Sequence, residues 1–115
     1  MMENTEIFKS EFGFDMPRSM LDFITLDLFD KSRPLRFVFR ENSFILEIQY
    51  FLDISEAQNY DVANKRLKFA VTTDGFDLWV DFNSEDILVF QEEFGDIEEI
   101  GVSLEEIVVA RKEYI

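Results

Sequence analysis

The sequence predicts an α+β domain over residues 1–115, with helices packed on a twisted sheet of about five or six strands. The sheet is expected to be mostly antiparallel, or mixed. Several stretches between Leu35 and Glu92 alternate apolar and polar residues with a period of two, and polar turn residues separate them. Helix-starting patterns occur near both ends of the chain. At 115 residues and 47% hydrophobic content, one domain can bury its own core.

Two helices are expected before the first strand. Residues 5–12 form the first, and Gly13 ends it. The second is expected to start with Asp15 as its N-cap and Pro17 in its first turn, where the missing N–H costs nothing. Residues 24–29 also alternate like a strand, so the end of this helix stays open. Its expected buried stripe is Met20, Phe23, Ile24 and Leu28.

Residues 35–40 are expected to form a strand, and residues 44–54 a longer one after a turn at 41–43. Every second residue of the longer strand is apolar, which predicts one buried face. That face comprises Phe44, Leu46, Ile48, Tyr50, Leu52 and Ile54. Ser55 and Gln58 then have the spacing of a capping box, which predicts a helix or helical turn over 56–64.

Residues 67–92 are expected to form three consecutive strands at the centre of the sheet. Asp74-Gly75 separates the first two and predicts a two-residue type I′ turn. Polar residues 83–86 predict the second turn. The expected apolar faces are Leu67, Phe69 and Val71 before the first turn and Phe76, Leu78, Val80 and Phe82 after it.

The C-terminal part is expected to contain a turn at 94–96, an extended segment at 97–100 and a final helix. Ser103 and Glu106 form a second capping-box pattern at the start of this helix. Leu104, Ile107 and Val108 follow at helical intervals. Arg111 and Lys112 are expected near its end, where positive charge suits the helix dipole.

The residue types present argue against catalysis. The chain has no Cys and no His, which excludes thiolate chemistry and removes the commonest general base and metal ligand. It also lacks a glycine-rich phosphate loop and a nucleophile motif. We therefore expect no enzyme activity and no cofactor. The N-terminus lacks the pattern of a signal peptide, and no apolar run is long enough to span a membrane, so we expect a cytoplasmic protein.

The charge points to the kind of partner. The chain carries 25 acidic and 11 basic residues, a net charge of −14. Such a surface repels nucleic acids and anionic membranes, and it attracts a basic protein. The simpler alternative is that the acidity only keeps a domain with 14 Phe residues soluble.

Carboxylates near the central hairpin suggest a second class of function. Asp74, Asp77 and Asp81 could hold a divalent cation or perform acid–base chemistry. The turn alone accounts for Asp74, however, and Asp77 and Asp81 alternate with the buried positions of their strand. We therefore predict no metal site.

The candidate partner-binding residues are an acidic cluster around Gly95 and an aromatic residue on the polar side of its strand. We expect the acidic side chains to form one negative rim around Trp79. A solvated loop and an aromatic residue covered by a helix remain the alternatives. The predicted set is Trp79, Asp77, Asp81, Glu85, Asp86, Glu92, Glu93, Asp96, Glu98 and Glu99.

The sequence resembles the SUKH superfamily (the Smi-one/Knr-four type domain). The similarity covers FDMP at 14–17 with LDFI at 21–24, LKFA at 67–70 with the DG turn at 74–75, and IGVSLEEI at 100–107. Lys68 stands where the family commonly has proline.

The resemblance implies an α+β fold and no catalytic residues. For bacterial members it implies an immunity protein that neutralises a polymorphic toxin, often a nuclease; eukaryotic members resemble regulatory scaffolds. The partner expected from charge and resemblance together is a basic toxin domain, bound by a monomer or weak homodimer. A regulatory or scaffold domain that binds another cytoplasmic protein is the alternative.

Overall fold

The computed structural model describes residues 4–25, 34–39, 44–109 and 112–114. Its eight strands form one sheet in the order β7-β6-β5-β4-β2-β1-β8, and β3 pairs with β4 outside this path. The strands are β1 (Leu35–Phe39), β2 (Phe44–Phe51), β3 (Tyr60–Asp61), β4 (Arg66–Thr72), β5 (Asp77–Asp81), β6 (Leu88–Glu93), β7 (Asp96–Ser103) and β8 (Lys112–Tyr114). The helices are α1 (Asn4–Phe12), α2 (Arg18–Thr25) and α3 (Leu104–Val109), with a 3₁₀ helix, η2 (Ala57–Asn59).

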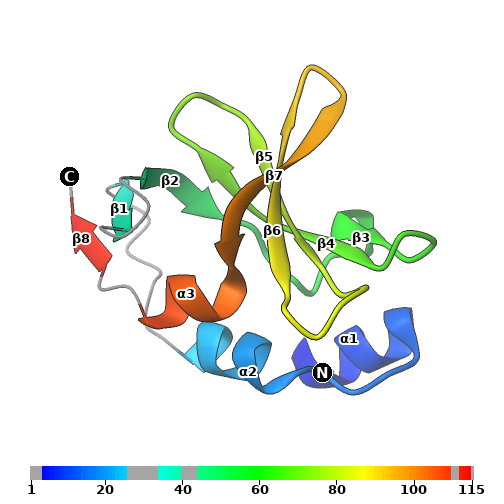
Figure 1. Ribbon diagram of the computed structural model, residues 1–115. Helices are drawn as coiled ribbons and strands as arrows, with labels where there is room; N and C mark the ends of the chain where they lie inside the picture. Colours follow the sequence, from blue (N-terminus) through cyan, green and yellow to red (C-terminus); the bar gives the residue numbers. More distant parts are fainter. Residues whose placement is uncertain (1–3, 26–33, 40–43, 110–111, 115) are drawn as a thin grey trace.

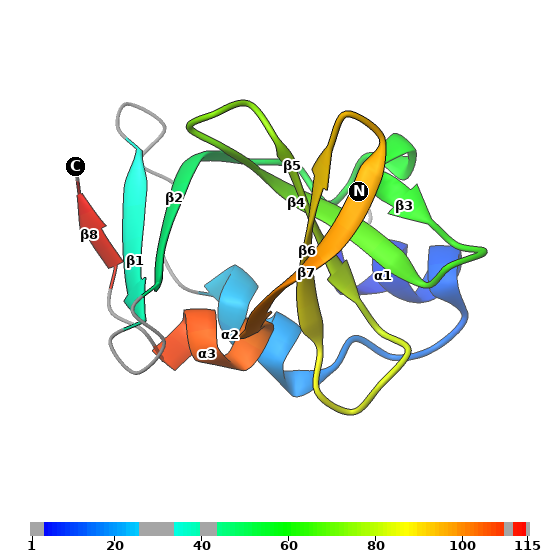
Figure 2. The same ribbon diagram turned by 45° about the horizontal axis from the view of Figure 1, so that its top comes forward.

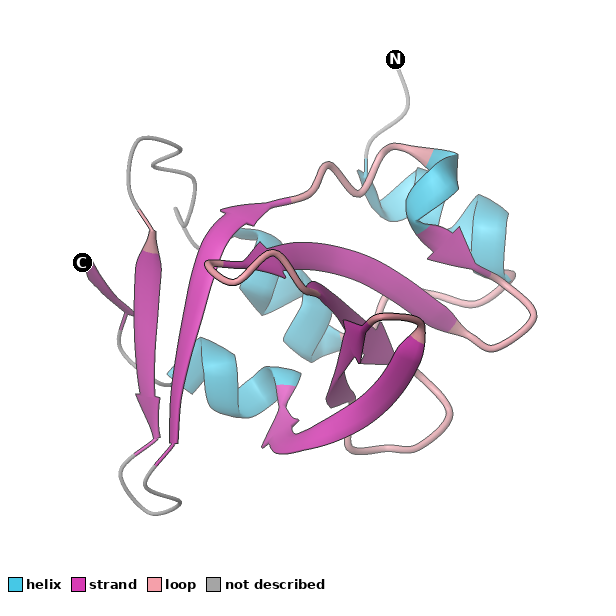
Figure 3. Ribbon diagram, turned by 90° about the horizontal axis from the view of Figure 1, so that it is seen from above, coloured by secondary structure: helices cyan, strands magenta, loops and turns pink. Residues whose placement is uncertain are grey.

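The three α-helices lie along one side of the sheet, and the β4–β5 and β6–β7 hairpins project on the opposite side (Figure 1). The sheet curls, with β8, β1 and β2 at one side and β4 to β7 at the other (Figures 2 and 3). Every strand pairing among the described residues is antiparallel. An antiparallel sheet with separate short helices is the arrangement expected of the α+β class. The sheet has eight strands, however, where the sequence predicted about five or six.

One apolar core joins the helices to the sheet. Phe8 of α1, Met20 of α2 and Leu104 of α3 are fully buried together with the inward residues of the strands. Around Phe8, four further rings from α1, its following loop, β3 and the residue after β5 form an edge-to-face cluster. These rings belong to Phe12, Phe14, Tyr60 and Phe82.

The first two helices form largely where expected. Gly13 ends α1 with a φ of +85°, and its N–H donates to the carbonyl of Lys9 at 2.8 Å. The carbonyl of Pro17 accepts from the N–H groups of Met20 and Leu21, so α2 begins directly after Pro17. The N-cap prediction for Asp15 is therefore wrong, and its carboxylate pairs with Nζ of Lys9 at 3.1 Å. Leu28, the turn at 41–43 and Arg111 lie outside the described residues.

The buried face of β2 differs from the predicted one because the strand contains a bulge. Leu46 and Ile48 are buried as expected, but the pairing with β4 shifts register between Ile48 and Tyr50. Because a bulge inserts one residue, the alternation reverses beyond it. Tyr50 is consequently exposed, and Phe51 packs edge-to-face on the ring of Phe23.

A second bulge lies in β4. Its register on β5 shifts between Lys68 and Ala70, so Phe69 and Ala70 are both buried. Beyond the bulge Thr72 lies on the buried face, and Val71, predicted there, is only partly buried.

The predicted turn at Asp74-Gly75 exists, but its type was wrong. The N–H of Thr72 donates to the carbonyl of Phe76 at 2.8 Å, so the hairpin loop has the three residues 73–75. Gly75 alone has a positive φ in this loop, at +85°. This combination is typical of a type I turn followed by a left-handed glycine.

The capping box predicted at Ser55 does not form, and the helix expected over 56–64 is limited to η2. The amide of Asn59, which is buried, instead donates to the carbonyl of Asp53 at 2.9 Å. Strand β3 then begins at Tyr60, because pairing with β4 replaces further helix.

The capping box at the start of α3 does form. The N–H of Glu106 donates to Oγ of Ser103 at 3.2 Å, and the N–H of Ser103 donates to the carboxylate of Glu106 at 3.3 Å. Leu104 and Ile107 are buried as predicted. The helix ends at Val109, and Lys112, predicted near its end, lies instead in β8, which pairs with β1.

Candidate protein-binding surface

The sequence-predicted acidic residues around Gly95 lie on one projecting element, the β6–β7 hairpin. We call residues 91–100 the acidic hairpin. It stands on the side of the sheet opposite the helices (Figure 1). Glu93 pairs with Asp96, which leaves a loop of two residues, Phe94 and Gly95. Both residues have positive φ, at +52° and +86°, and therefore form a type I′ turn.

Phe94 is the unusual residue of this turn. Asparagine, aspartate and glycine tolerate a left-handed φ, whereas a bulky side chain there is an outlier. The left-handed conformation costs an ordinary L-residue roughly 1–2 kcal/mol. Phe94 is also 92% exposed, with its ring edge-to-face to Phe76 at 6.0 Å between centroids. The fold thus holds a large apolar side chain in a strained conformation in water.

Carboxylates surround Phe94 on its hairpin. Glu93, Asp96 and Glu98 are exposed. They line a shallow hollow of about 260 Å³ together with Gln91, Phe94, Glu99 and Ile100. Among the described residues, the carboxylates of Glu93, Asp96, Glu98 and Glu99 form no ion pair. Their charge is therefore not neutralised within the part of the chain that the structure shows.

Glu92 lies on the face of the acidic hairpin opposite to Glu93, Asp96 and Glu98, and it has a structural partner. Its carboxylate accepts a hydrogen bond from the indole N–H of Trp79 at 3.0 Å. The ammonium of Lys68 lies 5.1 Å from the centre of the Trp79 ring and 3.3 Å from the carboxylate of Asp77. Trp79 and Asp77 are half-buried in these contacts, so the predicted rim around an exposed Trp79 does not form.

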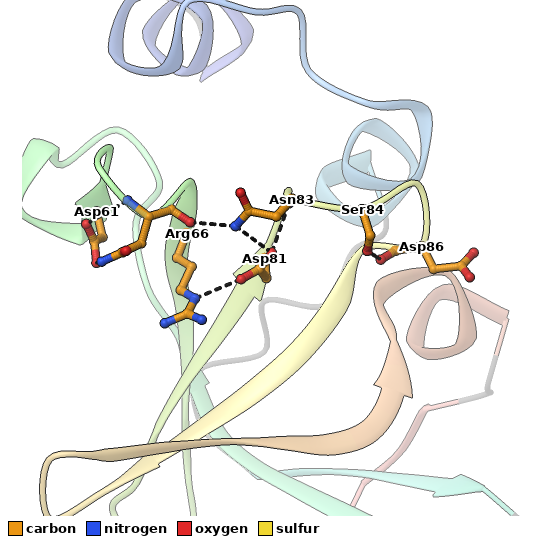
Figure 4. Close-up of polar contacts among 7 residues, drawn as sticks. Asp61, Arg66, Asp81, Asn83, Ser84 and Asp86 are labelled. Atoms are coloured by element: carbon orange, nitrogen blue, oxygen red, sulfur yellow. Dashed lines mark hydrogen bonds and ion pairs between the residues drawn. The ribbon is translucent and has the colours of Figure 1, made fainter.

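Asp81 also belongs to a structural network (Figure 4). Its carboxylate accepts from Nε of Arg66 at 2.8 Å and from the backbone N–H of Asn83 at 2.8 Å. The amide of Asn83 also donates to the carbonyl of Asn64 at 2.7 Å, which ties the β3–β4 turn to the β5–β6 loop. Burial raises the pKa of Asp81, but the hydrogen bonds from Arg66 and Asn83 and the charge of Arg66 outweigh it, so the pKa is lowered.

Glu85 and Asp86 do not join the acidic hairpin. They are exposed in the loop before β6, whereas Phe94 follows the other end of that strand. In Figure 1 this loop lies on the side of the helices, and the tip of the acidic hairpin lies on the opposite side. Six residues of β6 separate them, which is about 20 Å of extended chain.

The structure therefore brings together Glu93, Phe94, Asp96, Glu98 and Glu99, and it places the other predicted site residues elsewhere. Sequence reasoning assigned Phe94 only to a turn. The signal that could have identified it is Phe-Gly between two strand patterns, because a two-residue hairpin requires positive φ at its first position.

Within the described residues, no three acidic side chains are arranged to hold a metal ion. The three carboxylates considered for that role have different surroundings. Asp77 pairs with Lys68, Asp81 pairs with Arg66, and Asp74 is exposed in its turn. The helices among the described residues do not have the length and hydrophobicity of a membrane-spanning segment.

Comparison with protein-family models, with curated proteins and with solved structures finds no match for this chain. The resemblance to the SUKH superfamily therefore stays a prediction from the sequence.

Proposed function

We propose that the protein is a cytoplasmic, non-catalytic binding domain that captures a basic protein partner with the acidic hairpin. The observation that carries the proposal is Phe94, which is 92% exposed at a φ of +52°. Strain at an exposed residue persists when function selects the side chain, because a less strained residue would otherwise serve the fold better.

The surroundings of Phe94 indicate the chemistry of the partner. Interfaces are commonly built from an apolar aromatic anchor with polar residues around it. Here the polar residues are the carboxylates of Glu93, Asp96, Glu98 and Glu99, which have no ion-pair partner among the described residues and attract lysine and arginine. In a protein of net charge −14, they also speed the encounter with a basic partner.

The more specific form of the proposal is an immunity protein. The resemblance to the SUKH superfamily supports it. Carboxylates also mimic the negative charge of phosphate groups, which a basic nuclease-type toxin binds. The regulatory or scaffold alternative predicts a partner that is not a toxin and whose binding responds little to salt.

The test compares two variants of equal charge in affinity capture from a lysate of the source organism. One neutralises the acidic hairpin through Glu93→Gln, Asp96→Asn, Glu98→Gln and Glu99→Gln. The control neutralises four exposed carboxylates on the helix side through Glu6→Gln, Glu85→Gln, Asp86→Asn and Glu105→Gln. Both changes raise the net charge from −14 to −10.

We expect a basic protein to bind the wild type and the control variant and to elute from both at high salt. The hairpin variant should retain at least about tenfold less of it, because its carboxylates no longer attract the partner. Equal retention by the two variants would contradict the proposal, since it would show that only total charge matters.

A further inference from the structure

β7 is an edge strand, and its free side is continuous with the acidic hairpin. It ends the order of the sheet, and β6 is its partner among the described strands. The turn at Phe94-Gly95 fixes which backbone groups are free. In a two-residue hairpin the closing pair is hydrogen-bonded, and bonded and non-bonded pairs then alternate. The backbone N–H and C=O groups of Asp96 and Glu98 thus form hydrogen bonds with β6. The backbone N–H and C=O groups of Ile97 and Glu99 point away from the sheet.

We infer that the partner binds by adding an extended, basic segment to β7 as a further antiparallel or parallel strand. This inference rests on the proposed function and assigns its mode of binding. Strand addition supplies affinity through main-chain hydrogen bonds, and the side chains at alternate positions supply selectivity.

Charge complementarity selects the occupant. Asp96, Glu98 and Glu99 place carboxylates on both faces of β7, because successive side chains alternate. An added strand therefore meets negative charge on either face, which favours lysine or arginine at its positions. A second copy of this chain would place these carboxylates opposite their own kind, and like charges across strands are unfavourable.

The bulge near Gly101 sets one limit of the docking edge. The pairing of β7 with β6 shifts register between Leu88 and Phe90, and Gly101 has a φ of +81°. A bulge bends a strand and interrupts its regular pairing. The regular edge thus runs from Asp96 to about Ile100 and begins directly after the Phe94-Gly95 turn.

The test uses an eight-residue peptide of alternating lysine and valine, acetylated and amidated, with NMR-detected hydrogen exchange on the intact protein. Binding should slow exchange at the amides of Ile97 and Glu99 by at least about tenfold, because strand pairing places them in hydrogen bonds. Exchange at Asp96 and Glu98 should change less, since these amides already bond β6.

A matched pair of variants isolates the backbone group. Ile97→Pro removes the outward N–H, and proline is tolerated on an edge strand when its missing N–H faces solvent. Ile97→Ala removes the same side chain but keeps the N–H. We expect the proline variant to bind the peptide at least about tenfold more weakly than the alanine variant, with both folds checked by their NMR spectra.

Peptide binding that leaves exchange at Ile97 and Glu99 unchanged would overturn strand addition, as would an absence of peptide binding. Either result leaves the capture experiment on the acidic hairpin to decide the proposed function separately. Slowing of these two amides by raised protein concentration alone would also overturn the inference, because it would identify a second copy as the occupant.

Discussion

Phe94 links the stability of the fold to its proposed function. Replacing it with asparagine, the residue that type I′ turns prefer at this position, should remove the left-handed strain and lose only the ring contact with Phe76. We predict that Phe94→Asn raises the free energy of unfolding by about 1 kcal/mol and weakens partner binding. Urea denaturation measures the first effect, and affinity capture measures the second.

Gly95→Ala provides the control within the same turn. It should lower the free energy of unfolding by about 1 kcal/mol or more, because alanine at a φ of +86° is strained. The space around Gly95 is open, so this loss would come from the backbone and not from a clash. A loss of stability in Phe94→Asn comparable to that in Gly95→Ala would contradict the account of strain at Phe94.

Asp81 should make stability depend on pH in the acid range. Its folded-state pKa lies below the unfolded value of about 3.9, so folding favours the charged form. The stabilisation is present above about pH 4 and is lost as the pH falls through the folded-state pKa.

Asp81→Asn should lower the free energy of unfolding at pH 7 by about 1–3 kcal/mol, since it removes a charged acceptor that is only 10% exposed. It should also flatten the loss of stability as the pH falls below about 4. Denaturation with urea at several pH values measures both. An unchanged pH profile in the variant would show that other carboxylates cause the acid sensitivity.

At the scale of single elements, two capping-box patterns with the same spacing had different outcomes. The capping box of Ser103 and Glu106 forms because a helix follows it and buries Leu104 and Ile107 against the core. The pattern of Ser55 and Gln58 forms no capping box, because the side-chain amide of Asn59 donates to the carbonyl of Asp53 and the following residues pair with β4 as strand β3. Local spacing could not distinguish these cases, since tertiary contacts decided them.

These two serines supply the matching prediction. Ser103→Ala should lower the free energy of unfolding by about 1 kcal/mol, because it removes the N-cap of α3. Ser55→Ala should change it by less than about 0.5 kcal/mol, because its exposed hydroxyl caps no helix. Thermal or urea denaturation of both variants checks the difference, and equal losses would contradict the assignment of the caps.

The strands were largely predictable from the period-two alternation, but the faces of β2 and β4 were not. The bulges lie near Gln49 and Phe69, and neither residue is a glycine or proline that would indicate a break. Likewise, Asp74-Gly75 favoured a type I′ turn, and only the observed register shows that the loop has three residues. β8 depends on pairing with β1, which is distant in the sequence and leaves no local pattern.

At the scale of the whole molecule, the sequence predicted an acidic surface but could not show its extent. Glu85 and Glu92 are close in the sequence, yet they lie at different ends of β6. The sequence suggested Trp79 as an aromatic anchor for a partner, whereas its indole N–H and ring have partners in Glu92 and Lys68. The curled sheet instead places the helices on one side and the acidic hairpin on the other (Figure 1). We therefore expect the partner to bind away from the helices.

The most direct test of this account is NMR mapping of the isotope-labelled protein titrated with the basic protein that affinity capture recovers. We predict that the largest shift changes fall on the amides of Phe94 to Glu99, with α1 and α2 nearly unchanged, and that the changes weaken as salt is raised. Shift changes concentrated on the helices, with the acidic hairpin unaffected, would contradict the central claim that this hairpin is the binding surface.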